Sequence, residues 1–155
     1  KSSYCMDDEQ NIYRIGSNNN DMESNVVYSI NKKCIQKINN LNISRHFHSV
    51  LHSSHHGLIV LGGINDINNK PVSTIECLSK ISSKWEINKF SQMPTPKYKH
   101  SCTLFNNNKH IIECGGFDSN NNCMNSSSIY NISSNKWTSI PNMTLNRIEC
   151  GITNY

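Results

Sequence analysis

A pattern of about 51 residues runs three times through the chain, and it constrains the fold more than any single motif does. Its first element is a strand-like apolar run that ends at a pair of small residues: NIYRIGS (11–17), GLIVLGG (57–63) and HIIECGG (110–116). A sequence that repeats at a fixed period builds an array of similar units, each of which buries its apolar surface against its neighbours. The repeat therefore predicts three similar structural units.

Two further elements follow the small-residue pair in each unit. The second element is VVYSINKKCI (26–35), IECLSKISSKW (75–85) and SIYNISSNKW (128–137). It places one residue seven positions before a large one, in the pairs Tyr28 and Ile35, Leu78 and Trp85, Tyr130 and Trp137. The third element is LNISRHFH (41–48), MPTPKYKH (93–100) and MTLNRIEC (143–150), in which Leu41, Met93 or Met143 stands four residues before Arg45, Lys97 or Arg147.

Each unit is expected to form four short β-strands. The chain has no alanine, the best helix former, and about one residue in six is asparagine, which favours turns. The first strand of a unit is expected at approximately 46–54, 98–106 and from 148 onward, and the second runs into the glycines. The third ends near the Tyr position, and the fourth starts at Ile35, Trp85 or Trp137. Large rings at these positions are expected to fill the space between adjacent units.

This pattern resembles the kelch repeat, whose units carry a Gly-Gly pair, a Tyr, a Trp and a basic residue before the next unit. The resemblance covers essentially the whole chain and departs from the family at Ser17, Ile35, Leu78 and Lys97. It implies an all-β fold: a kelch-type β-propeller segment of about three four-stranded blades plus the first strand of a fourth.

The approximate units are 1–44, 45–96 and 97–146, with 147–155 opening a further blade. Closed propellers typically need about four to eight blades. We therefore expect the remaining blades to come from the rest of a longer chain, or the blades to stack as an open arc.

Five histidines fall within RHFHSVLHSSHHG (45–57) and would suit zinc or copper if they converged: His46, His48, His52, His55 and His56. His48 occupies the same repeat position as His100, on the first strand of a unit. His55 and His56 fall at the following hairpin tip. We therefore expect a strand and an exposed tip here, with no metal site and no cofactor.

The seven cysteines include no CxxC pair, which argues against a disulfide framework and a zinc finger. Cys77, Cys102 and Cys114 align with apolar residues of sister units, so we expect reduced core thiols in a cytoplasmic protein. No spacing holds a base beside a thiol, and no Gly-rich phosphate loop is present. We therefore expect no catalytic residues and no enzymatic activity.

The alternative is part of a galactose-oxidase-like copper enzyme, whose propeller resembles kelch. That chemistry requires copper held by His and Tyr, and a Cys–Tyr cross-link. Tyr4, Cys5 and Tyr98 are not spaced to demand such a site.

Charge and hydropathy narrow the class of partner. The net charge is +4, only 17% of residues are charged, and the basic residues are scattered, so we expect no nucleic-acid binding. No apolar run approaches the roughly 18–20 residues that cross a bilayer, so we expect no membrane insertion. A protein partner, of unknown identity, is the expectation that remains.

The candidate partner-binding residues lie in loops at equivalent positions of the units. They are Asp21, Glu23, Asp66 and Asp118, after the small-residue pairs, and Arg45, Lys97 and Arg147, which open each new unit. The carboxylates either form an acidic rim or make the turn that follows Gly-Gly. The cations either contact a ligand or brace neighbouring loops through carbonyls and carboxylates.

A propeller would place these loops on one face. The loops 17–25, 64–73 and 117–127 are equivalent, and the loops 39–45, 91–97 and 141–147 should reach the same side. Variable loops on a rigid scaffold suit binding. The kelch resemblance implies protein binding through blade-connecting loops, with actin binding or substrate recruitment for ubiquitin ligation as the family's commonest uses.

Overall fold

The computed structural model describes residues 2–16, 26–31 and 34–153. Within these ranges all regular structure is β-strand, and no helix is present. The described chain accordingly holds no helix with the length and apolarity needed to cross a membrane. The expected all-β class is confirmed.

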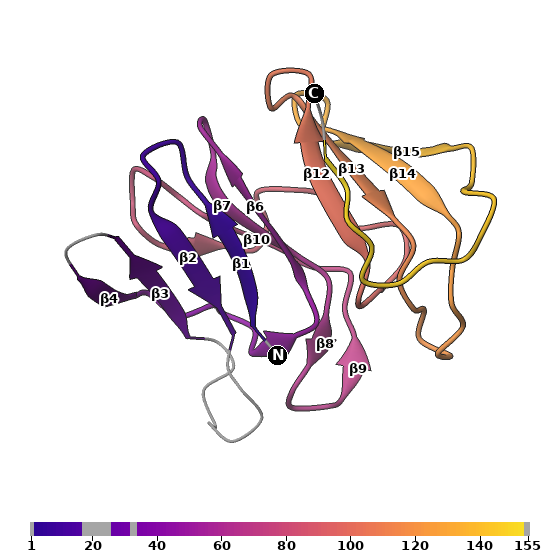
Figure 1. Ribbon diagram of the computed structural model, residues 1–155, viewed down its shortest axis with the longest axis horizontal. Helices are drawn as coiled ribbons and strands as arrows, with labels where there is room; N and C mark the ends of the chain where they lie inside the picture. Colours follow the sequence, from indigo (N-terminus) through magenta and orange to yellow (C-terminus); the bar gives the residue numbers. More distant parts are fainter. Residues whose placement is uncertain (1, 17–25, 32–33, 154–155) are drawn as a thin grey trace.

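Three four-stranded antiparallel sheets follow one another along the chain (Figure 1). Blade 1 contains β1 (Ser3–Met6), β2 (Ile12–Ile15), β3 (Val27–Ile30) and β4 (Ile35–Ile38). Blade 2 contains β6 (Ser49–Ser53), β7 (Gly57–Leu61), β10 (Ile75–Leu78) and β11 (Trp85–Glu86). Blade 3 contains β12 (Ser101–Phe105), β13 (His110–Cys114), β14 (Ser127–Asn131) and β15 (Lys136–Ile140). The first strands of the blades, β1, β6 and β12, lie next to one another, as the innermost strands of propeller blades do. The expected kelch-type propeller segment is confirmed.

A smaller sheet forms at one end of blade 2. It joins β5 (Arg45–His46), β8 (Ile64–Asn65) and β9 (Lys70–Pro71). Blade 3 repeats this arrangement as two isolated bridges, Tyr98 with Phe117 and Phe117 with Cys123. In each case the loop between the second and third strands pairs with the segment that enters the blade. These loops and the β6–β7 and β12–β13 hairpin tips lie at opposite ends of the blades (Figure 1).

The hydrophobic core lies between the blades, and β7 contributes to both sides of its own sheet. All five residues of β7 are buried. Leu58 and Val60 belong to a cluster with the blade 1 residue Ile15, whereas Ile59 and Leu61 belong to a cluster that includes residues of blade 3. Successive side chains of a strand point to opposite faces, so this one strand is packed against both neighbouring blades.

The tryptophans repeat one contact at successive blade junctions. The Trp85 indole nitrogen donates to the Asn39 carbonyl over 2.7 Å, and the Trp137 indole nitrogen donates to the Ser91 carbonyl over 3.2 Å. Each acceptor lies 46 residues before its tryptophan. Trp85 is 8% exposed, and Trp137 is half-buried against the core between blades 2 and 3. The expected packing between blades is thus confirmed for both rings, although Trp137 is not fully buried.

The expected equivalence of Tyr28 with Leu78 and Tyr130 is wrong. Leu78 pairs with Trp85, and Tyr130 pairs with Trp137. In blade 1 the residue that pairs with Ile35 is Ile30. Four residues separate the paired Ile30 and Ile35, whereas six separate Leu78 from Trp85 and Tyr130 from Trp137. The seven-residue spacing from Tyr28 therefore ends at a different register position. Tyr28 instead pairs with Arg14, whose guanidinium lies 5.9 Å from the ring centroid.

The glycine pairs allow the chain to approach the next blade closely. The Gly63 amide donates to the Lys97 carbonyl, and the Gly116 amide donates to the Arg147 carbonyl, each over 2.8 Å. Gly62 has a φ of +60°, and a Cβ on it would lie 2.7 Å from both the Lys97 oxygen and the His100 ring. A side chain here would force two blades apart.

A serine hydroxyl also links each blade to the next. Ser3 donates to the His48 carbonyl and Ser49 donates to the His100 carbonyl, each over 2.7 Å, and Ser101 donates to the Cys150 carbonyl. We call these three bonds the serine ladder. The expected first strand of a fourth blade is not formed, because residues 147–153 contain no strand, but the ladder binds Cys150 as it binds His48 and His100.

His48 and His100 are buried directly before β6 and β12. Each is 5% exposed, and their ring nitrogens have no hydrogen-bond partner within the described structure. Burial lowers the pKa of both to about 3, and the nearby charges of Arg45 at His48 and of Lys97 at His100 lower it further. Both rings are therefore neutral at neutral pH.

Replacement of Trp85 by Ala should cost about 3–5 kcal/mol of unfolding free energy, because it leaves a cavity between blades 1 and 2. Trp85→Phe should cost less, since it keeps an aromatic ring and loses the bond to Asn39 and only part of the buried ring. Urea unfolding measures both, with Ile81→Ala as the control because Ile81 is 98% exposed. Equal midpoints for Trp85→Ala and Ile81→Ala would contradict the blade-junction role.

Acid should destabilise the fold between pH 6.5 and 3. The folded pKa of His48 and His100 lies below the usual 6.5, so in this window the unfolded chain binds protons that the folded chain does not. The loss is about 1.4 kcal/mol per pH unit for each ring, or up to about 2 kcal/mol each at pH 5. The difference in urea midpoint between pH 7 and pH 5 should shrink in His48→Gln/His100→Gln. It should be unchanged in His55→Gln, because that side chain is exposed.

Candidate functional site

The end of the blades that carries the expected binding loops is called the loop face. Among the described residues it comprises 39–47, 64–73, 91–99, 117–127 and 141–149. In this region short pairings and side-chain bonds hold the loops of adjacent segments together.

Arg45 lies beneath the loop face and is fully buried. One guanidinium nitrogen donates to the carbonyls of Gly62 and Thr74, each over 3.0 Å, and another donates to the Glu76 carboxylate over 2.6 Å. Glu76 is also fully buried and accepts from the Asn42 amide over 2.7 Å. Arg45 therefore joins β5 to β10 and to the residue that follows β7, and Glu76 adds the segment before β5.

Lys97 makes the corresponding bridge in blade 3. Its ammonium donates to both oxygens of Glu113, over 2.8 and 3.0 Å, and to the Ser126 hydroxyl over 2.9 Å. Burial raises the pKa of Glu113, while the Lys97 charge opposes that rise. Glu113 pairs across the sheet with Ser128, whereas in blade 2 the carboxylate is on the third strand, where Glu76 pairs with Val60. Glu76 and Glu113 thus occupy the two positions of the same cross-strand pair: the acid is on the third strand in blade 2 and on the second strand in blade 3.

These bonds overturn the assignment of Arg45 and Lys97 as partner-contacting residues. Both side chains are almost completely buried and cannot meet a partner. They brace neighbouring segments, which is the second of the two interpretations offered for them. The side chain of Arg147 is exposed.

Asp66 and Asp118 both take part in bonds within the loop face. Asp66 accepts from the Ser44 hydroxyl over 2.9 Å and pairs with His46, which ties β8 to the segment around β5. Asp118 accepts from the amides of Asn122 and Asn120, and the hydrogen bonds from Asn122 lower its pKa most. Asp118 therefore makes its own turn.

Asp21 and Glu23 lie outside the described residues.

A row of aromatic rings crosses the loop face, and sequence reasoning did not select it. Phe47 and Tyr98 have ring centroids 6.3 Å apart, and Tyr98 and Phe117 stack at 5.2 Å. The Tyr98 hydroxyl donates to the Asn121 side chain over 2.7 Å. All three rings are half-buried. We call Phe47, Tyr98 and Phe117 the aromatic row. The sequence feature that could have pointed to it is that Phe47 and Tyr98 lie within two residues of a unit-opening cation.

Three equivalent residues at the entry to successive blades have a left-handed backbone. They are Phe47, Lys99 and Glu149, with φ of 55°, 54° and 47°. The Lys99 amide donates to the Phe47 carbonyl and the Glu149 amide donates to the Lys99 carbonyl, each over 2.9 Å. Bulky residues rarely adopt this conformation, and such strain clusters at functional sites.

We call Phe47, Lys99 and Glu149 the left-handed row, and their side chains meet at Lys99. The Lys99 ammonium lies 4.8 Å from the Phe47 ring centroid and 3.4 Å from a Glu149 carboxylate oxygen. A cation, an anion and aromatic rings therefore meet at one place on the loop face. Such a surface can offer a partner both apolar area and paired charge.

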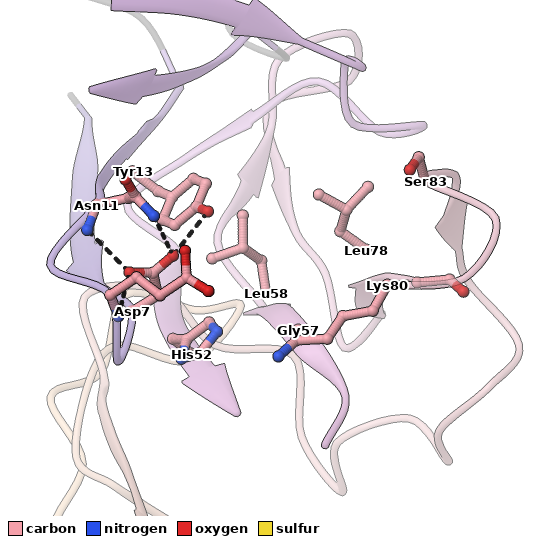
Figure 2. A pocket seen from close by; sticks show the side chains of 11 residues that line it. Asp7, Asn11, Tyr13, His52, Gly57, Leu58, Leu78, Lys80 and Ser83 are labelled. Atoms are coloured by element: carbon pink, nitrogen blue, oxygen red, sulfur yellow. Dashed lines mark hydrogen bonds between the residues drawn. The ribbon is translucent and has the colours of Figure 1, made fainter. Parts of the chain in front are cut away.

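A pocket of about 380 Å³ lies at the opposite, hairpin end between blades 1 and 2 (Figure 2). The Asp7 carboxylate there accepts from the Asn11 amide and side chain and from the Tyr13 hydroxyl. Burial acts to raise the pKa of Asp7, but these hydrogen bonds outweigh it and the pKa is lowered. Burial, followed by the bond to Asp7, raises the pKa of Tyr13 to about 12. The carboxylate thus stabilises its own hairpin.

The histidines of 45–57 do not converge. His46 pairs with Asp66, His48 is buried, His52 lines the hairpin-end pocket, and His56 packs edge-on against Phe90. Across the described ranges no three His, Cys, Asp or Glu side chains come together in a way that could hold a metal ion.

The residues weighed for a copper enzyme are also separated. Tyr4 and Cys5 are neighbours on β1 and point to opposite faces of blade 1. Tyr98 stacks on Phe117 beside blade 3. The Cys–Tyr arrangement of that chemistry is not formed by these three residues.

Replacement of Arg45 by Met should cost about 3–5 kcal/mol of unfolding free energy, because it leaves Glu76 charged and buried without its partner. The double variant Arg45→Met/Glu76→Met should be more stable than the single one, since it removes that charge. Urea unfolding measures both, with Lys99→Met as the control for a partly exposed pair, at less than about 1 kcal/mol. A double variant less stable than the single variant would contradict the buried-pair interpretation.

Comparison with known proteins supports the repeat. Residues 100–144, from His100 through β15 to Thr144, match the Kelch motif family. Two curated F-box/kelch-repeat proteins of Arabidopsis thaliana are 28% and 26% identical to the chain over 93 residues, or 60% of its length. The chain spans about a quarter of each relative (26% and 25%).

Kelch repeats serve generally as protein-interaction modules, and the matches support that role for this segment. The motif match, the two relatives and three successive four-stranded blades together support a kelch-repeat protein.

Proposed function

We propose that the loop face binds a protein partner at the aromatic row and the left-handed row, without catalysis. The observation that carries this proposal is the repeated left-handed backbone at Phe47, Lys99 and Glu149. The geometry is the same in each blade entry while the side chain changes from aromatic to basic to acidic. A fixed backbone with variable side chains is what a binding surface on a repeat scaffold requires.

The chemistry of the two rows suits a protein surface. Aromatic side chains supply large contact area at low entropic cost and are enriched among residues that dominate binding energy. Lys99 and Glu149 add charges at the same place. Exposed charges are screened over about 8–10 Å at physiological salt, so binding at this face should weaken as salt increases.

The relatives point to one use of such a surface. Their names combine an F-box with kelch repeats. The kelch resemblance of the sequence implied substrate recruitment for ubiquitin ligation or actin binding, and the relatives favour the first. We therefore propose that the loop face recruits a substrate protein as part of a longer adaptor chain.

We place this adaptor in the cytoplasm. Its seven cysteines are free thiols. Free thiols suit a reducing compartment.

The Lys99→Glu variant should weaken capture of the partner, because it places a second carboxylate beside Glu149. Partners are first identified by quantitative affinity purification with the full chain. The affinity of the strongest one is then measured by calorimetry. Lys99→Glu and Tyr98→Ala should each weaken binding at least about tenfold, equivalent to 1.4 kcal/mol.

The matched control is Lys109→Glu, which makes the same charge change at an exposed position on the opposite hairpin tip. It should leave the affinity unchanged. If Lys109→Glu abolishes binding while Lys99→Glu and Tyr98→Ala do not alter it, the partner docks on the hairpin end and the proposal fails.

A further inference from the structure

The three junctions of the serine ladder differ in the side chains that meet there. The ladder serines Ser3, Ser49 and Ser101 pair across their sheets with Ile15, Leu61 and Cys114. Their carbonyl acceptors belong to His48, His100 and Cys150. The first two junctions thus combine an aliphatic residue with a histidine, whereas the third has cysteine at both positions.

The two thiols of the third junction lie together. The Cys150 sulfur is 3.3 Å from the Ser101 hydroxyl oxygen, and Ser101 pairs directly with Cys114. Ser101 therefore lies beside both cysteines, and Cys150 acts on the Cys114 thiol by raising its pKa. We propose that Cys114 and Cys150 form a site of reversible oxidation, at which a disulfide links the segment after blade 3 to β13.

The environments of the two thiols define the order of the reaction. Cys150 is half-exposed and can be reached by a small oxidant, whereas Cys114 is buried. Burial, followed by the neighbouring Cys150, raises the pKa of Cys114 to about 11. Cys150 therefore reacts first, and Cys114 acts as the resolving thiol held beside it.

With hydrogen peroxide as oxidant, the sulfur of Cys150 attacks one peroxide oxygen, the O–O bond breaks, and one water leaves. The resulting sulfenic acid is attacked by the sulfur of Cys114, so that the S–S bond forms and the S–O bond breaks. The Cys114 proton leaves with the hydroxyl group as a second water. In total two thiols and one peroxide give one disulfide and two waters. Two molecules of reduced glutathione reverse the reaction and become oxidised glutathione.

Other cysteines are placed less well for this pairing. Cys77 is buried in the core between blades 2 and 3, and its thiol contacts the His56 carbonyl. Cys102 packs against that same core, and burial raises its pKa well above the usual value. Cys123 pairs with Phe117 in the loop face. Each of these three thiols therefore lies in surroundings that differ from those of Cys114 and Cys150 at the third junction.

The test is peptide mapping of the purified full chain after treatment with hydrogen peroxide. Trypsin cleaves after Lys109, Lys136 and Arg147, so the disulfide should join peptide 110–136 to the peptide that begins at residue 148. Peptide 110–136 also contains Cys123, so the mapping is carried out in Cys123→Ser. The linked pair should lack two hydrogen atoms relative to the sum of its peptides, and reduced glutathione should release it.

The link should disappear in Cys114→Ser and Cys150→Ser. As a check that needs no variant at the pair, the oxidised wild-type chain is unfolded and alkylated with N-ethylmaleimide. Cys114 and Cys150 should lose labelling together while Cys77 and Cys102 keep it. Absence of the link in Cys123→Ser, its survival in Cys114→Ser, or loss of Cys150 labelling without that of Cys114 would each overturn the proposal.

Discussion

The five residues of β7 are buried on both faces of their sheet, with Leu58 and Val60 against blade 1 and Ile59 and Leu61 packed toward blade 3. A single four-stranded sheet cannot bury both of its apolar faces, so its core must lie in the junctions with the neighbouring blades. The junction contacts repeat for that reason. Each tryptophan reaches back 46 residues to a carbonyl, and each ladder serine reaches forward to the next blade.

The buried ion pairs fix the position of the loops, whereas the apolar cores hold the blades together. Strands of two to five residues cannot fix the long connections between them through the backbone hydrogen bonds of strand pairing alone. Arg45 and Lys97 reach inward from these connections and bind a carboxylate, together with carbonyl or hydroxyl oxygens that only one loop arrangement brings together. Burying charge is costly, and its benefit is often a unique geometry instead of added stability. Here the geometry obtained is that of the loop face.

The repeat made the blades predictable because spacing alone marks the glycines, the tryptophans and the unit boundaries. It failed at Tyr28, because a connection two residues shorter gives the same spacing with a different register. For Arg45 and Lys97 it left open whether the side chain contacts a partner or braces the loops. A cation beside a loop carries no mark of burial, and the acids that bind them come from different strands in the two blades. Prediction of the aromatic row would have required knowing which loops lie side by side, and the sequence of a single repeat does not contain that information.

Residues 45–48 show how one short stretch separates architecture from recognition. Arg45 is buried and braces the blade, His48 is buried beside the serine ladder, and Phe47 between them is partly exposed at the loop face. The left-handed backbone at Phe47 turns its side chain out of a stretch whose other members are fixed by packing. The same turn presents Lys99 and Glu149 in the next entries. Selection for a new partner can therefore change these positions without disturbing the cation or the histidine position on either side, because the same left-handed backbone holds an aromatic, a basic and an acidic residue in the three entries.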